Sequence, residues 1–144
     1  MKKRGYFNRR EFLKMGEWKS SRSRKWRELN SNASIVSISK RLFATDYEKK
    51  RTQLLTSLSG VRIPTASAIL MLTDPKNYGV IDIWVWKLLY HYGEVNTKPT
   101  GTNFSFKNWY NYLMKLRFWA EKFNVNVRDI ERTLYDYADE EVDI

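Results

Sequence analysis

Residues 46–73 constrain the fold most, because they combine two helix-forming segments with a glycine turn between them. Asp46 is a typical N-cap residue and is expected to open a helix over 47–57. Gly60 then allows the backbone to turn with a positive φ angle, which other residues rarely adopt. Pro64 follows at a place where proline is tolerated, the first turn of a new helix. The residues after it are almost wholly apolar, so the pattern predicts a tight helical hairpin whose second helix is buried.

Helical patterns account for most of the remaining chain. Asn8, with Glu11 three residues later, has the sequence of a capping box. Two short stretches look strand-like, 35–38 and 80–83, and residues 19–25 read as a polar basic loop. We therefore expect an all-α protein that forms one compact multi-helix domain, 1–144. Its expected helices cover residues 8–18, 32–44, 47–57, 65–72, 82–92, 106–123 and 127–138.

The charge of the chain is unevenly distributed. The formal net charge is +10, and the basic N-terminal flank, 1–30, carries eleven Lys and Arg residues against three Glu. The acidic C-terminal end, 129–144, carries seven acidic residues against one Arg, and its carboxylates are expected to be solvated. A basic flank favours contact with a polyanion through one face, although a merely solvated surface would have the same composition.

Several classes of function are excluded by composition. The chain has no cysteine, which rules out disulfides, thiol catalysis and a cysteine-held iron–sulfur cluster. His91 is the single histidine, so a His-rich metal site is excluded and no metal is expected. No apolar run approaches the roughly 20 residues of a membrane helix. No apolar stretch follows the basic start, as it would in a secretory signal, so we expect a cytoplasmic protein that does not enter a membrane.

The hairpin has the chemistry of a phosphate-binding turn. The first N–H groups of a helix have no partner within that helix, so they can bind a phosphate of double-stranded DNA without reading its sequence. An ordinary hairpin inside a helical bundle is the competing interpretation. The residues expected at the backbone contact are Gly60, Val61, Arg62, Ile63, Pro64 and Thr65, with Val61 as an apolar plug between the helices. Further phosphate contacts are expected from Arg22, Arg24 and Lys25, together with Lys19 and Arg27.

Asp82 places one carboxylate at the start of an otherwise apolar helix, twenty-two residues after Gly60. Taken alone, an aspartate in this position is most simply a helix N-cap, worth about 1 kcal/mol. Its spacing from the hairpin is what favours a functional role.

At this point the chain resembles the helix-hairpin-helix DNA glycosylase superfamily, which includes endonuclease III, the adenine and 8-oxoguanine glycosylases and the alkyladenine enzymes. That family has a hairpin of the form L-P-G-V-G-x-x-T-A followed by V-D-x-x-x-x-R/K. The resemblance covers about 46–92 and implies a helix-hairpin-helix motif at 46–73, with Asp82 as the catalytic acid. The residues that match are Leu58, Gly60, Val61, Thr65, Ala66, Ile81, Asp82 and Lys87.

The chain departs from that pattern at two hairpin positions. Pro64 stands where bifunctional members carry a Schiff-base lysine, so the resemblance implies a monofunctional enzyme. Arg62 stands where the second hairpin glycine is usual, which leaves open whether the hairpin carbonyls hold a monovalent cation; no other cofactor is expected. The chain is also short for this family.

The leading hypothesis is therefore a monofunctional DNA N-glycosylase. An ionised aspartate stabilises the positive charge that develops on the deoxyribose, and the target base must first leave the stack and enter a pocket. A non-catalytic helix-hairpin-helix DNA-binding module remains the alternative, and an interaction protein with aromatic faces is a third reading. Protein partners and the excised base are not predicted. The aromatic residues named as walls of a base pocket are Trp84, Trp86, Tyr90, Trp109 and Trp26.

Overall fold

The computed structural model describes residues 1–140, with side chains through Ala138. Within this range the chain forms helices and no strand, so the predicted all-α class is confirmed and the strand-like stretches are not strands. Residues 141–144 of the predicted acidic end lie outside the described part. The helices are α1 (Arg9–Lys19), α2 (Arg24–Arg27), α3 (Asn32–Phe43), α4 (Glu48–Thr56), α5 (Ile63–Thr73), α6 (Ile83–His91), α7 (Phe106–Phe123) and α8 (Val127–Glu140).

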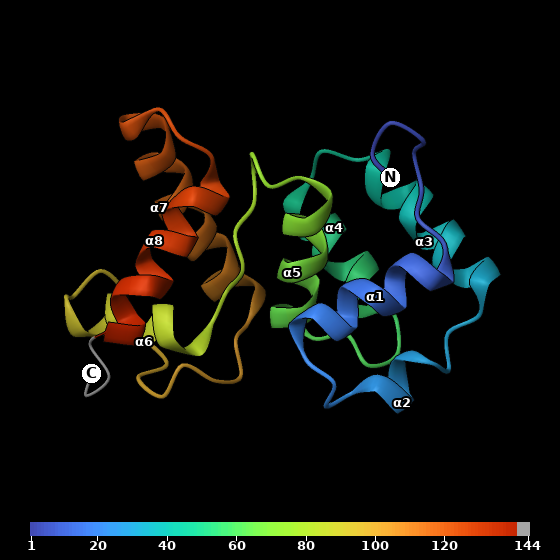
Figure 1. Ribbon diagram of the computed structural model, residues 1–144, viewed down its shortest axis with the longest axis horizontal. Coiled ribbons are helices and arrows are strands. Elements are labelled where there is room, and N and C mark those ends of the chain that lie inside the picture. The colour runs from blue at the N-terminus through green and yellow to red at the C-terminus, as the bar shows by residue number, and fades with distance from the viewer. Residues whose placement is uncertain (141–144) are drawn as a thin grey trace. The chain divides into compact units, whose positions relative to one another are not determined.

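The helices belong to two compact units (Figure 1). Unit 1 spans Met1–Thr73 and contains α1 to α5; unit 2 begins at Asp74 and contains α6 to α8. In unit 1, α1 packs against α2, α3 and α5, while α4 packs against α3 and α5. In unit 2, α8 packs against both α6 and α7. The predicted hairpin therefore lies in unit 1, and Asp82 lies in unit 2.

Unit 1 is built on a capped first helix and a buried α5. The predicted capping box is confirmed: Asn8 accepts from the N–H of Glu11 at 2.9 Å, and the Glu11 carboxylate accepts from the N–H of Asn8 at 3.0 Å. On α3, buried Ser39 accepts from the N–H of Phe7 at 2.9 Å, which joins the N-terminal segment to that helix. The apolar face of α1 and most of α5 are buried, as predicted.

Two local predictions in unit 1 are wrong. Residues 19–25 are not all loop, because a short helix, α2, begins at Arg24. Asp46 is not the N-cap of α4; it is fully exposed, and the N-cap is Tyr47, which makes no side-chain capping bond. The helix after Asp46 begins at Glu48, one residue later than expected, and the Asp46 carboxylate is instead ion-paired with Arg51.

Unit 2 surrounds a buried segment that leads into α6. Residues 78–81 are buried although they are not helical. Gly93 follows α6 with φ +75°, as predicted for the residue after a helix C-terminus. On α7 the side chains of Trp109 and Tyr112 are buried in the core of the unit. None of the described helices is long and apolar enough to cross a lipid bilayer.

Candidate functional site

The turn between α4 and α5 has the tight geometry predicted from its sequence. Gly60 adopts φ +74°, in the left-handed region that favours glycine. The N–H of Val61 donates to the carbonyl of Leu58 at 3.3 Å, and both side chains are buried. Val61 is thus the apolar plug of the turn.

The backbone donors of this turn are left available. The first bond into α5 is donated by Ala66 to the carbonyl of Arg62, at 2.8 Å. Within the described chain, no hydrogen bond is formed by the N–H groups of Gly60, Arg62, Ile63 or Thr65, and Pro64 has none to offer. Such a group of donors at a helix N-terminus is a favourable environment for an anion.

The segment containing α2 lies directly against the turn. A Cβ atom at Gly60 would lie 2.7 Å from Cγ of Arg27 and 2.8 Å from its backbone nitrogen, so the two backbones approach closely. Asn30 adds two hydrogen bonds to this contact. Its amide oxygen accepts from the N–H of Ser59 and its amide nitrogen donates to the carbonyl of Ser59, each at 2.9 Å. The basic segment and the hairpin therefore form one local structure.

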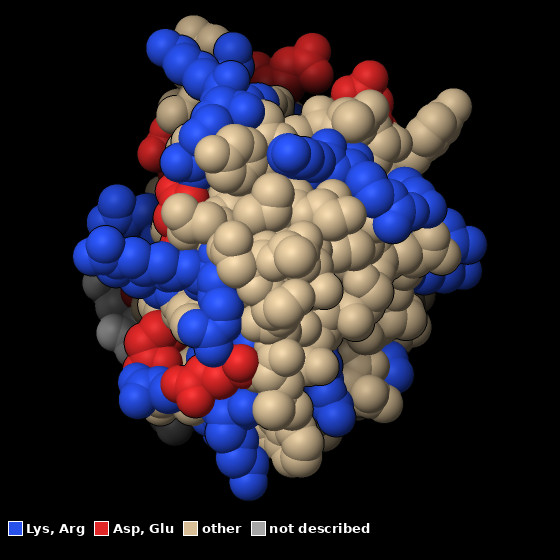
Figure 2. All heavy atoms as spheres, turned by 90° about the vertical axis from the view of Figure 1, so that its right-hand side faces the viewer, with Lys and Arg blue, Asp and Glu red and all other residues tan. Residues whose placement is uncertain are grey.

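Of the five cations predicted to contact DNA, three are exposed, Lys19 is half-buried and Arg27 is buried. Arg22, Arg24 and Lys25 are exposed, and Arg24 is ion-paired with Glu17. Arg27 was expected to contact DNA, but only 1% of its surface is exposed, so that expectation is wrong. Figure 2 views the molecule from the side that carries α2 and α3, where Lys and Arg side chains surround a broad uncharged area.

Asp82 is the N-cap of α6. Its carboxylate accepts from the N–H of Trp84 at 2.8 Å, and the side chain is half-buried. The capping interpretation is therefore correct for the fold.

A buried acid cluster lies behind the segment that leads to Asp82. Glu131 on α8 is 3% exposed, accepts from the N–H of Val80 at 2.8 Å and is ion-paired with Arg128. Tyr112 on α7 donates to the carbonyl of Val80 at 2.7 Å. Both polar groups of the Val80 backbone are thus bound by side chains from other helices. The expectation that the C-terminal carboxylates are solvated is wrong for Glu131.

The pKa values of Tyr112 and Glu131 are raised above their usual values. Burial raises the pKa of the Tyr112 hydroxyl well above its usual value, and the charges of Glu131 and Asp82 act in the same direction. Burial also raises the pKa of Glu131; the Asp82 charge adds to this, while the bond from Val80 and the Arg128 charge oppose it. Asp82 is therefore near enough to act electrostatically on both groups. Glu131 and Tyr112 were not predicted as site residues from the sequence, because only the packing of α7 and α8 places them beside Val80.

Some of the aromatic residues predicted to line a base pocket are buried, and others are exposed. Trp109 is 1% exposed and packs against Tyr112 in the core of unit 2. Trp84, Tyr90 and Trp26 are exposed, the last beside Lys25, whose Nζ lies 5.2 Å from the ring centroid.

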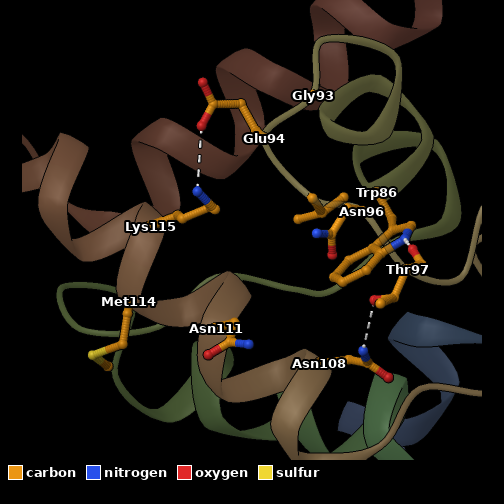
Figure 3. A pocket seen from close by; sticks show the side chains of 10 residues that line it. Trp86, Gly93, Glu94, Asn96, Thr97, Asn108, Asn111, Met114 and Lys115 are labelled. Atoms are coloured by element: carbon orange, nitrogen blue, oxygen red, sulfur yellow. Dashed lines mark hydrogen bonds and ion pairs between the residues drawn. The ribbon is translucent and has the colours of Figure 1, made fainter.

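Trp86 lines a cavity of about 300 Å³ in unit 2 (Figure 3). Three side-chain contacts attach the 93–97 loop to the cavity walls. Trp86 Nε1 donates to the carbonyl of Thr97 at 2.9 Å, and Asn108 Nδ2 donates to the hydroxyl of Thr97 at 3.2 Å. Lys115 Nζ donates to Glu94 at 3.3 Å. Asn96 and Asn111 also line the cavity, and their side chains form no hydrogen bond in the described structure. The cavity is polar, and the one Lys and the one Glu in its lining cancel in charge.

Among the described residues, no group of three or more His, Asp or Glu side chains is arranged to hold a metal ion. The structure thus packs the α2 segment against the hairpin turn in unit 1, and it brings together Asp82, Val80 and Glu131 in unit 2. Comparison of the chain with protein-family models, with curated proteins and with solved structures finds no match.

Proposed function

We propose that this protein binds double-stranded DNA by its phosphate backbone through α4 and α5, acting as a helix-hairpin-helix motif. The observation that carries the proposal is the set of backbone N–H groups between Gly60 and Thr65 that have no partner in the described chain. A bound phosphate would satisfy these donors and would also meet the positive end of the α5 dipole. The α2 segment supports the same function, because its backbone packs against Gly60 and it carries the exposed cations Arg22 and Lys25.

The contact is expected to be independent of DNA sequence. Backbone amides recognise phosphate oxygens, which are the same at every nucleotide, and flexible Lys and Arg side chains add screened charge–charge attraction. Binding should therefore fall steeply with salt and vary little among duplex sequences.

We further propose that the reaction is cleavage of an N-glycosidic bond at Asp82, without a lysine-linked intermediate. In that reaction the bond from the sugar C1′ to the base nitrogen breaks and its electron pair leaves with the base. Water then forms the new bond to C1′ and gives up a proton. A half-buried carboxylate is suited to stabilise the intervening sugar cation, because it is less screened there than in water. Asp82 has this environment at the N-terminus of α6.

One observation favours the second candidate function, a non-catalytic DNA-binding module. Asp82 already caps α6 through a 2.8 Å bond from Trp84, a role that needs no reaction. The two functions share the hairpin and differ only in whether Asp82 acts on DNA.

The test measures binding and excision with the same duplexes. Binding of 20-bp duplexes of several sequences, followed over a range of salt concentrations, tests the hairpin; no binding at low salt would rule out both functions. Duplexes carrying single deaminated, oxidised or alkylated bases then test the reaction. A glycosylase without a lysine nucleophile should give strand breaks only after alkali, and borohydride should trap no protein–DNA adduct. Binding without excision on every lesion would favour the binding module.

A further inference from the structure

The cavity in unit 2 is large enough to hold one flat polar group. Its volume of about 300 Å³ is at the lower end of the range for small-molecule sites, and its walls come from α6, α7 and the 93–97 loop (Figure 3). Asn111 lines it from α7 and Asn96 from the loop, and neither side chain forms a hydrogen bond in the described structure. An amide presents a donor and an acceptor side by side, as the edge of a nucleobase does.

The charges in the cavity lining neutralise each other. Lys115 Nζ lies 3.3 Å from the carboxylate of Glu94, and these are the charged residues of the lining. Met114 adds apolar surface to the same wall as Asn111. The cavity therefore favours an uncharged group with a polar edge over a phosphate or another anion.

The row of α7 residues that lines the cavity continues to an exposed phenylalanine. Residues three and four apart on a helix are neighbours. Phe118 follows Asn111 by seven residues and Lys115 by three, so it lies on the same face of α7, beyond the cavity. Its side chain is 63% exposed, while the opposite face of α7 is buried in the core of the unit. An exposed aromatic ring next to a polar cavity is a platform on which a second ring can stack.

The charge of α7 indicates what kind of molecule carries these rings. The helix has four cationic residues, Lys107, Lys115, Arg117 and Lys122, against one acidic residue, Glu121. The surroundings of the cavity thus attract an anionic chain, whereas the cavity itself is neutral. Single-stranded nucleic acid combines these properties, because its phosphates are charged and its unpaired bases are flat, uncharged and free to leave the strand. In a duplex the base edges are paired and the ring faces are stacked, so neither is free to occupy the cavity.

We infer that unit 2 binds single-stranded nucleic acid, with one unpaired base in the cavity, a neighbouring base stacked on Phe118 and the phosphates beside the cations of α7. Phe118 lies about 6 Å along the helix axis from Met114, a distance that neighbouring nucleotides of an extended strand can bridge. Neither the hairpin nor Asp82 lines this cavity, so the inference goes beyond the proposed function and requires no reaction.

Binding of labelled 12-nucleotide strands of deoxyadenosine, deoxycytidine or thymidine, followed by fluorescence anisotropy, tests the stacking platform. Phe118→Ala removes it. Phe123→Ala is the matched control, because Phe123 is 61% exposed on the same helix but lies about 140° further round it. We expect Phe118→Ala to bind all three strands about 10-fold more weakly, the loss typical of one stacked base, and Phe123→Ala to stay within about 2-fold. Equal affinities of the two variants would overturn the proposal. Both side chains are exposed, so neither change should prevent folding.

Asn111→Ala tests the cavity itself. Stacking accepts any base, whereas hydrogen bonds to an amide differ from base to base. The wild type should therefore bind the three strands with unequal affinity. Asn111→Ala should reduce that inequality, and Phe118→Ala should keep it. Equal binding of the three strands by the wild type, or an unchanged preference in Asn111→Ala, would show that no base enters the cavity and would overturn the proposal.

A duplex measurement separates this site from the hairpin. Phe118→Ala should bind a 20-bp duplex as the wild type does, whereas Gly60→Ala should bind it more weakly. Binding of single strands that depends on Phe118, without binding of duplexes, would support this inference and reject the hairpin function.

A second copy of the chain is the other occupant that an exposed aromatic ring would accept. Size-exclusion chromatography of the wild type and Phe118→Ala tests this alternative. A wild-type dimer that Phe118→Ala dissociates, together with no binding of the single strands, would overturn the proposal.

Discussion

The carboxylate of Glu131 accepts a hydrogen bond of 2.8 Å from the backbone N–H of Val80, a residue fifty-one positions earlier in the chain. Tyr112 holds the carbonyl of the same residue from α7. Val80 is thus clamped on both sides, two residues before Asp82. The placement of the candidate catalytic carboxylate therefore depends on side chains from α7 and α8.

Glu131→Gln should change how stability depends on pH. The folded protein raises the pKa of Glu131 above its value of 4.5 in the unfolded chain, mainly through burial. The folded state therefore binds this proton more readily, so the stabilisation is present below pH 4.5 and is lost as the pH rises through the raised pKa. As the pH rises over that range, the unfolding free energy of the wild type should fall relative to that of Glu131→Gln. Denaturant titrations of both proteins measure this difference. Glu121→Gln, an exposed change on α7, is the matched control.

Tyr112→Phe should destabilise unit 2 without changing its charge. The substitution removes the donor to the Val80 carbonyl and leaves that buried group without this hydrogen bond. The loss should be about 1–3 kcal/mol of unfolding free energy, measured by chemical denaturation. Tyr110→Phe on the same helix is the control, because that side chain is 40% exposed and should change stability by less than about 0.5 kcal/mol. Equal effects of the two changes would contradict a stabilising hydrogen bond between Tyr112 and Val80.

Gly60→Ala and Gly93→Ala separate backbone strain from steric collision. Both glycines have nearly the same positive φ, +74° and +75°. A Cβ at Gly93 meets nothing within 4 Å, whereas one at Gly60 meets the Arg27 backbone at 2.8 Å. Gly93→Ala should therefore cost about 1–2 kcal/mol from the left-handed conformation alone. Gly60→Ala should cost more in thermal or chemical unfolding, and it should weaken binding to all duplex sequences about equally.

Replacing Arg22, Arg24 and Lys25 with Ala should reduce the salt dependence of DNA binding. Each lost phosphate contact changes the slope of log K against log salt by about 0.9, so loss of all three contacts should change it by about 2.7. The control carries Ala at Arg41, Lys49 and Lys50, three exposed cations of unit 1 with the same total charge. A slope that stays at the wild-type value in the α2 variant, measured by fluorescence anisotropy, would show that this segment does not contact DNA.

Asp82→Asn separates capping from chemistry. Asn caps helices about as well as Asp, so the bond from Trp84 should persist and stability should change by only a few tenths of a kcal/mol. DNA affinity should stay level or rise, because a negative charge has been removed. Excision under single-turnover conditions should fall by on the order of 10²–10³-fold if the carboxylate stabilises the sugar cation. Excision at the wild-type rate would exclude Asp82 as the catalytic residue.

Local chemistry allowed much of the fold to be predicted from the sequence. Helix periodicity and the capping residues located seven of the eight described helices to within a few residues, and Gly60 marked the hairpin turn correctly. The position of Asp82 before an apolar run suggested a capping role beside the functional one, and the structure shows the capping bond. Helix periodicity, capping and the glycine turn depend on residues that are close together in the sequence, so they can be predicted from the sequence alone.

Tertiary packing alone decided which side chains meet. Arg27 looked like one more exposed cation, but packing against Gly16 and Gly60 buries it. Glu131 looked like part of a solvated acidic end, but α8 turns it toward the Val80 amide. Burial of a polar or aromatic group depends on partners that are distant in sequence, since a charge is stable inside a protein only where other elements supply its hydrogen bonds and counter-charges. The sequence determined where the helices begin and end, and only the assembled units determined which of their charged groups face solvent.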